Sequence, residues 1–154
     1  EITIPKKTFW NAPKTILDAF KENIRDNSPN TEDYSKSKPE TVEKMSFIPQ
    51  GGNWKNIPTH LKVTGTFSNY MRRLNLKETS PTIVNPRKSI ILSPLENRIV
   101  SVRECAAIMG MPHDFEFLGN LNEKQQQVAN GVTKAIGNGL AKLISAFIRR
   151  KQND

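Results

Sequence analysis

The sequence lacks the features that define several large classes of protein. No apolar run approaches the ~20 residues that a membrane-spanning helix needs, so a transmembrane protein is excluded. The single cysteine, Cys105, excludes a framework of disulfide bonds and fits a reducing compartment. Only two histidines, His60 and His113, accompany it, which leaves too few ligands for a structural zinc site.

The residues also lack a recognisable catalytic centre. No glycine-rich loop stands between a strand pattern and a helix pattern, so no phosphate-binding motif is present. Cys105 is flanked by Ala106 and Ala107 in a helical pattern, where a small residue is typical of packing rather than of a nucleophile. His113 lies in a turn pattern without a second histidine or a carboxylate pair. We therefore expect no catalytic residue and no metal ligand in this chain.

The positive charge is concentrated in the middle of the chain. Residues 51–100 carry eight basic side chains and two acidic ones, whereas residues 1–50 carry eight of each. This stretch supplies most of the net charge of +8. A local basic excess is typical of a face that binds a polyanion. Solvated lysine-rich loops would give the same count, so charge alone leaves both interpretations open.

The first two parts of the chain differ in residue composition and hydrophobic pattern. Residues 1–44 contain a helical pattern over 16–25, capped at Thr15, and then a polar linker with little expected order of its own. Glycines and prolines interrupt residues 45–97, which favours short strands joined by turns. The predicted fold class is therefore α+β, with a small strand-rich domain in the middle of the chain.

Helical patterns return in residues 98–154. The first helix follows Ser101, where Ser101-Val-Arg-Glu104 has the spacing of a capping box. A second helix is expected after a cap at Asn122, and a third over 138–151. The apolar residues of the third recur at helical spacing, which predicts one amphipathic packing face.

Two runs in this C-terminal part resemble conserved motifs of the DNA (cytosine-5) methyltransferases. The run from Arg98 to Phe115, RIVSVRECAAIMGMPHDF, is similar to the ninth motif of that family, R-x-L-T-x-R-E-x-A-R-L-Q-G-F-P-x-x-F. The run from Gln127 to Val132, QVANGV, resembles the tenth motif, Q-x-G-N-A-V. Ala129 replaces a glycine of that motif, and the proline that usually follows Val132 is absent.

The resemblance extends upstream and then stops. Ile48 to Trp54, and Arg73-Leu74 followed by Ser80 to Ile83, resemble the start and end of the family's target-recognition region. The four matches cover about residues 45–150. Three motifs of the family are missing: the Pro-Cys nucleophile, Glu-Asn-Val, and the Phe-x-Gly-x-Gly cofactor loop.

Membership of this family would imply a function that the chain shares with another polypeptide. These enzymes flip a cytosine out of double-stranded DNA, attack C6 with a thiolate and methylate C5 from S-adenosylmethionine. The present chain would supply the recognition domain and the helices that complete a Rossmann-like domain. A catalytic partner chain would carry the Pro-Cys and Glu-Asn-Val motifs, so this chain alone is predicted to be inactive. The family also implies a cytoplasmic protein of bacterial type.

The resemblance also implies roles for individual residues. Residues 45–97 would be the DNA-binding region, and residues 98–154 would complete the catalytic domain. The predicted DNA contacts are Arg72, Arg73, Thr82, Ile83, Asn53 and Lys55. The residues predicted to line the pocket of S-adenosylmethionine are Asn130 and Gly131. The residues of the ninth motif with a predicted structural role, as ion pairs or caps, are Arg98, Arg103 and Glu104.

Two other interpretations remain open from the sequence. The chain could be a DNA-binding or regulatory protein that kept the recognition region after losing catalysis. It could also be a fragment of a longer single-chain enzyme. A catalytic chain encoded nearby would argue against the first, and a larger intact mass would favour the second.

Overall fold

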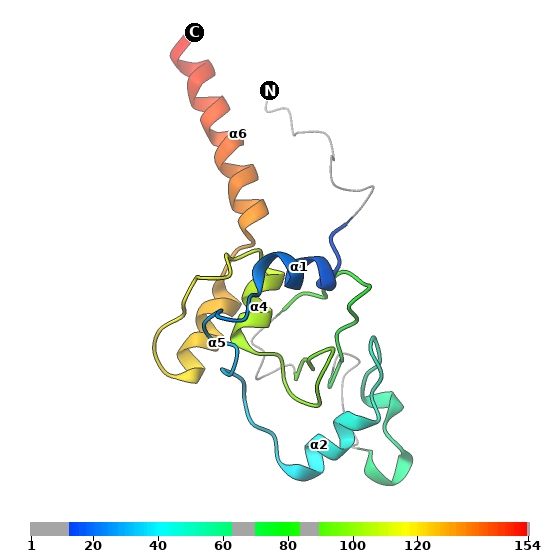
Figure 1. The fold of residues 1–154 in the computed structure, drawn as a ribbon. Coiled ribbons are helices and arrows are strands. Elements are labelled where there is room, and N and C mark those ends of the chain that lie inside the picture. Colours follow the sequence, from blue (N-terminus) through cyan, green and yellow to red (C-terminus); the bar gives the residue numbers. More distant parts are fainter. Residues whose placement is uncertain (1–12, 63–69, 84–89, 154) are drawn as a thin grey trace.

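A computed structural model describes residues 13–62, 70–83 and 90–153 of the chain. Its centre is formed by α1 (Ile16–Asn23), α4 (Val102–Ile108) and α5 (Leu121–Asn130). Helix α1 packs on α4, and α4 contacts α5. Helix α2 (Pro39–Ser46) lies at one end of this body, and α6 (Lys134–Asn153) projects from the other (Figure 1).

The described part of residues 45–97 contains two 3₁₀ turns, η1 (Trp54–Asn56) and η2 (Thr59–Leu61), and no strand. Its extended pieces meet only in isolated bridges, from Leu92 to Arg73 and to Ile99. The predicted strand-rich domain, and with it the α+β class, is therefore wrong for these residues. The φ angles of Met71 (49°) and Ile90 (43°) explain the difference, because positive φ ends an extended run after one or two residues.

The apolar pieces of this region are nevertheless buried without a sheet. Leu74, Ile91 and Leu92 join Val100 and Val102 in the main hydrophobic cluster. Their backbone groups pair across loops, for example from Leu74 N to Leu92 O at 3.1 Å. The hydrophobic pattern therefore identified core residues correctly but assigned them the wrong backbone conformation.

Two predicted capping boxes are confirmed. Thr15 and Asp18 cap α1, and Ser101 and Glu104 cap α4, each by reciprocal side-chain to backbone hydrogen bonds. The cap of α5 is Asn120 rather than Asn122. Gly119 adopts a φ of 105° immediately before it, so the chain turns two residues earlier than expected.

The remaining helix boundaries also differ from the predicted ones. Helix α1 ends at Asn23, and α6 begins at Lys134 rather than at residue 138. Gly137 and Gly139 do not interrupt α6, since a helix interior accepts glycine at a cost of about 1 kcal/mol relative to alanine.

The expected polar linker is ordered by contacts with α4. The first amides of α4 are those of Val102 and Arg103, and they donate to the carbonyls of Asp33 and Asn30. The Asn30 carboxamide also donates to Phe117 O and accepts from Phe117 N. The segment therefore closes the N-terminal end of α4, and α2 occupies the rest of the predicted linker.

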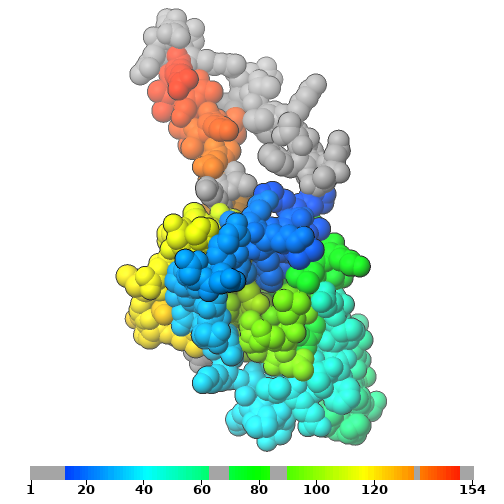
Figure 2. Space-filling model, viewed as in Figure 1, coloured from blue at the N-terminus to red at the C-terminus, as the bar shows by residue number. Residues whose placement is uncertain are grey.

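Helix α6 is amphipathic, and its apolar side chains lie at the surface. The large apolar residues of this face are between 47% and 59% exposed: Ile136, Leu140, Ile144, Phe147 and Ile148. Figure 2 shows α6 standing clear of the space-filling body. In the described part of the chain, no helix is long and apolar enough to cross a membrane.

Candidate nucleic-acid interface and cofactor wall

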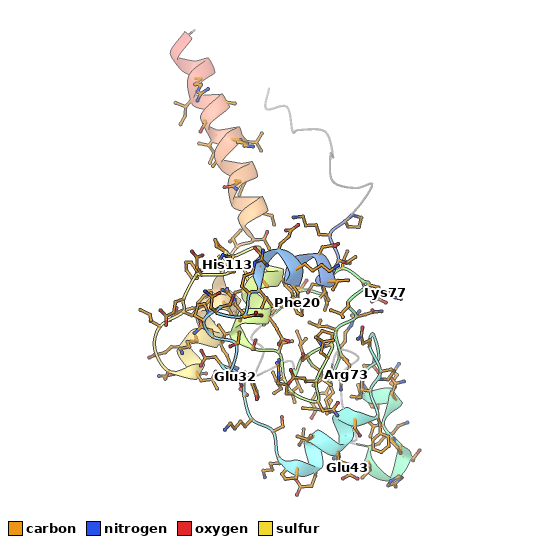
Figure 3. All side chains as sticks on the ribbon, in the orientation of Figure 1. Phe20, Glu32, Glu43, Arg73, Lys77 and His113 are labelled. Carbon is orange, nitrogen blue, oxygen red and sulfur yellow. The ribbon has the colours of Figure 1, made fainter. Side chains whose placement is uncertain are left out.

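Arg73 is buried and holds together the backbone around it (Figure 3). Its Nε donates to the carbonyl of Ile48 at 2.6 Å, and its Nη1 donates to Ser93 O at 2.7 Å and Glu96 O at 2.6 Å. Its Nη2 donates to Met45 O and to Asn97 Oδ1. The side chain thus joins α2 to the loop 93–97 and leaves no donor for DNA, since an arginine has five N–H groups.

Arg72 lies in a different environment. It is half-buried, and no hydrogen bond or ion pair of its guanidinium is found among the described residues. Its neighbours Met71, Arg73 and Leu74 are all buried, whereas part of the Arg72 side chain stays at the surface. Of the two predicted DNA contacts, Arg72 is therefore the one with a guanidinium left for a nucleic acid.

Gly51 and Gly52, which precede Asn53 and Lys55 in the chain, are hydrogen-bonded to the backbone of Arg73. Gly51 N donates to Arg73 O at 3.1 Å, and Arg73 N donates to Gly52 O at 2.9 Å. Asn53 caps η1, because its Oδ1 accepts from the amide of Lys55. The Lys55 side chain is exposed.

Thr82 and Ile83 lie at the end of a described segment. Thr82 is exposed, whereas Ile83 is half-buried and packs on the hydrophobic cluster. The basic residues Arg87 and Lys88, which follow them, fall outside the described residues. Of this pair, only the Thr82 side chain is open to a ligand.

Arg98 and Glu104 form the ion pair at the centre of the ninth-motif region. Arg98 Nη1 lies 2.7 Å from Glu104 Oε2, and its Nε pairs with the exposed Glu96. Burial opposes the charge, but the hydrogen bonds with Glu104 and Glu96 raise the pKa of Arg98 above its ordinary value. Glu104 also accepts from Ser93 Oγ and from Ser101 N, so one buried carboxylate joins the loop, the cap and the arginine.

Arg103 is fully buried on α4 and holds the following turn. Its Nη1 donates to the carbonyls of Pro112, His113 and Phe115 at 3.0, 2.7 and 3.2 Å. Its Nε and Nη2 are buried and have no hydrogen-bond partner among the residues that the structure describes. The guanidinium therefore holds residues 112–115 in place. Because it is buried, a ligand cannot contact it.

Cys105 is fully buried in α4. Burial, together with the charge of Glu104, raises the pKa of its thiol far above the ordinary value. A protonated thiol inside the core suits packing and not nucleophilic attack. Among the described residues, no cluster of three His, Cys, Asp or Glu side chains could hold a metal ion.

Asn130 and Gly131 form a small open wall where α5 ends. The Asn130 side chain is exposed, and its Oδ1 accepts from Gln126 Nε2 at 2.7 Å. A Cβ on Gly131 would lie 2.8 Å from Met109 Cε and 3.2 Å from Val128 O, so a larger residue there would require the end of the Met109 side chain to move. An exposed carboxamide beside a residue with no side chain fits one wall of a pocket for a small polar ligand, but not a whole pocket.

Comparison with known proteins decides which family this architecture represents. The family model of the C-5 cytosine-specific DNA methylases matches residues 3–146. The chain belongs to this family.

Relatives of the C-5 cytosine-specific methylases occur in bacteria and in animals. The chain is 35% identical to Type II methyltransferase M1.HphI of Haemophilus parahaemolyticus over 104 residues, which cover 67% of this chain and 27% of that protein. It is 31% identical to DNA (cytosine-5)-methyltransferase 1 of Gallus gallus over 116 residues, which cover 68% of this chain and 7% of the relative. The chain thus matches about a quarter or less of these two relatives' length.

A third methylase relative has a different length. Type II methyltransferase M.AquIB of Picosynechococcus is 30% identical over 118 residues, which cover 70% of this chain and 81% of the relative. Since the matched part is most of both proteins, M.AquIB is of about this chain's own size.

Sequence reasoning missed two elements of this methylase chain. The first is the role of Asn30, which the Ser28-Pro29-Asn30 turn signal could have suggested, because asparagine is common at positive φ and Asn30 has a φ of 64°. The second is a groove between α1 and α4, lined in part by Ala19 and Met109. The sequence signal for this groove was a small residue, Ala19, on the predicted N-terminal helix.

Proposed function

We propose that this chain is the DNA-recognition and C-terminal part of a DNA (cytosine-5) methyltransferase that assembles from two chains. The observation that carries the proposal is the apolar face of α6, which is about half exposed in a chain that matches only 27% and 7% of two longer relatives. An exposed apolar stripe of this length is typical of a surface that another protein covers. The comparable size of M.AquIB supports a separate short chain.

The division of labour follows from what the chain contains. The sequence has no Pro-Cys or Glu-Asn-Val motif, so the partner chain supplies the thiolate that attacks C6 of a flipped cytosine. S-adenosylmethionine supplies the methyl group for C5. This chain contributes one wall of the cofactor pocket through Asn130 and Gly131.

We assign the DNA-binding part of the function to Arg72, Asn53, Lys55 and Thr82, which lie in or next to loops of the region 45–97. Arg72 is the residue best suited to read a base, because a planar guanidinium can pair with guanine through two hydrogen bonds. Arg73 instead keeps the backbone around it in place through its five hydrogen bonds. Ile83 supports Thr82 from the core.

The experiment that tests this function is methyl transfer from labelled S-adenosylmethionine to double-stranded DNA. The assay compares three samples: this chain, the neighbouring polypeptide that carries the Pro-Cys and Glu-Asn-Val motifs, and the mixture. We expect transfer in the mixture only. Transfer by this chain alone would contradict the proposal. DNA binding without transfer in any sample would favour a non-enzymatic DNA-binding protein.

A further inference from the structure

A groove of about 560 Å³ separates α1 from the C-terminal end of α4. Its walls are mostly apolar, and it is large enough to take one or two side chains of a partner. Its lining residues include Ile16, Ala19, Ala107, Met109, Gly110 and Thr133.

Small residues make the groove, and hydrogen bonds fix its walls. Ala19 on α1 faces Ala107 and Gly110 at the end of α4, and none of the three fills the space between the helices. The N-terminal end of α1 is held in place because Ile16 N donates to Glu78 O at 2.9 Å. Asn23 Nδ2 donates to Ala107 O at 3.4 Å at the other end of α1. The groove is therefore a preformed hollow between fixed elements.

A weak ion pair crosses the rim of the groove. Lys14 and Glu22 both line it and form an ion pair at 2.6 Å, with side chains 67% and 50% exposed. An exposed ion pair of this kind contributes about 0–1 kcal/mol to stability, so its loss when a partner side chain enters costs little free energy.

The groove adjoins the start of α6. Thr133 lines the groove, the next residue begins α6, and Val132 on the other side is 60% exposed. The groove therefore lies next to the N-terminal end of the helix that stands off the body in Figure 2. A partner that covers α6 as far as its first turn lies within reach of the groove.

Charge favours a different protein over a second copy of this chain. Residues 134–151 contain five basic residues and no acidic one. Two copies packed through α6 would bring two basic helices together, which is unfavourable. An apolar partner surface flanked by carboxylates complements this helix.

We propose that the groove between α1 and α4 receives an apolar side chain of the catalytic chain, as the second half of a docking surface that begins on α6. This proposal rests on the proposed function, because it takes the partner to be the chain with the Pro-Cys and Glu-Asn-Val motifs.

Thiol footprinting tests the proposal directly. Cys105 is fully buried, so Ala19→Cys places the reactive thiol in the groove, and Glu43→Cys on the distant helix α2 is the matched control (Figure 3). We expect a maleimide to label both variants in the isolated chain. On addition of the catalytic chain, the labelling rate of the Ala19→Cys thiol should fall by about tenfold or more. The control rate should not change.

The outcomes separate this inference from the function on which it rests. If gel filtration shows a complex and the Ala19→Cys thiol still reacts at its free rate, the groove proposal is overturned and the two-chain function stands. If no complex forms with the wild-type chain, both are overturned.

A second pair of variants fills the groove instead of labelling it. Ala19→Trp should weaken binding of the catalytic chain by about tenfold or more without lowering the melting temperature, because the indole enters empty space. Glu43→Trp adds the same side chain at a distant exposed site and should change neither quantity. Unchanged affinity for Ala19→Trp would also overturn the proposal.

Discussion

Helices α4 and α6 both carry apolar side chains, but these side chains lie in opposite environments. In α4, every residue from Val102 to Ala107 is buried, including Arg103 and Glu104. In α6, the large apolar side chains are about half exposed. Helix α4 receives its partners from α1, α5 and the segment around Asn30 in the same chain. The comparison indicates that an amphipathic pattern marks a surface to be covered, but not the molecule that covers it.

The largest effect is expected where the half-buried Arg98 loses its buried partner on α4. Glu104→Ala should lower the free energy of unfolding by about 3–5 kcal/mol, because it leaves Arg98 with only the exposed Glu96 and removes the cap of α4. Urea denaturation measures this loss. Glu96→Ala is the control, since Glu96 also pairs with Arg98 but its side chain is 61% exposed, and it should cost less than about 1 kcal/mol. Equal losses would contradict the burial argument.

Charges on the apolar face of α6 should affect assembly and not stability. We expect Leu140→Glu with Ile144→Glu to weaken binding of the catalytic chain by about 100-fold or more, since each apolar side chain buried at the interface contributes about 1.5–3 kcal/mol. Titration calorimetry measures the affinity. The matched control places the same charges at Asn138 and Ser145, on the opposite side of the helix. Similar effects in both variants would show that the apolar face is not the docking surface.

A smaller effect should separate the two adjacent arginines. Arg72→Ala should weaken DNA binding by the assembled enzyme by about tenfold and lower the slope of its salt dependence, with no change in stability. Arg73→Ala should instead destabilise the chain, because four backbone carbonyls lose their donors. Fluorescence anisotropy at several salt concentrations and thermal melting distinguish the two. A stable Arg73→Ala variant would contradict the role assigned to its hydrogen bonds.

The smallest effect concerns the contact between Asp33, in the segment predicted as a linker, and Lys124 on α5. Partial burial raises the pKa of Asp33, but hydrogen bonds from Lys124 and Asn30 outweigh it, so the net pKa is lowered. A lowered folded-state pKa stabilises the fold above the unfolded value of about 3.9 and loses that contribution as pH falls toward the folded value. Asp33→Asn should therefore cost about 1 kcal/mol or less at pH 7, and this cost should shrink as the pH falls below about 3.9. A cost that stays the same across this pH range would contradict this account.

The starts of α1 and α4 could be predicted because their causes are local. Thr15 with Asp18, and Ser101 with Glu104, each close a hydrogen-bonded ring within four residues, and both rings are present. The spacing of apolar residues on α6 likewise predicts a face that depends on the helix alone. For such features, the sequence contains all the interacting groups.

The region 45–97 could not be predicted in the same way. Its apolar pieces resemble strands, but positive φ at Met71 and Ile90 is not signalled by those residue types. Arg72 and Arg73 are adjacent residues of the same type, so the sequence alone does not distinguish them. Arg73 is buried because its guanidinium contacts residues about 20 or more positions away, whereas no such contact of the Arg72 guanidinium is found in the described part of the chain. The order of the linker likewise depends on Asn30 meeting Phe117, 87 positions further along the chain.

One contact ties the groove to the proposed cofactor wall. Met109 lines the groove, and its Cε packs where Gly131 has no side chain. In the proposed two-chain enzyme, a partner side chain that contacts Met109 would therefore also act on the backbone of Gly131. Thermodynamic linkage makes such coupling reciprocal: whatever factor assembly adds to the affinity for S-adenosylmethionine, the cofactor returns to the affinity between the chains. The supply of methyl donor would then regulate how much of the enzyme is assembled.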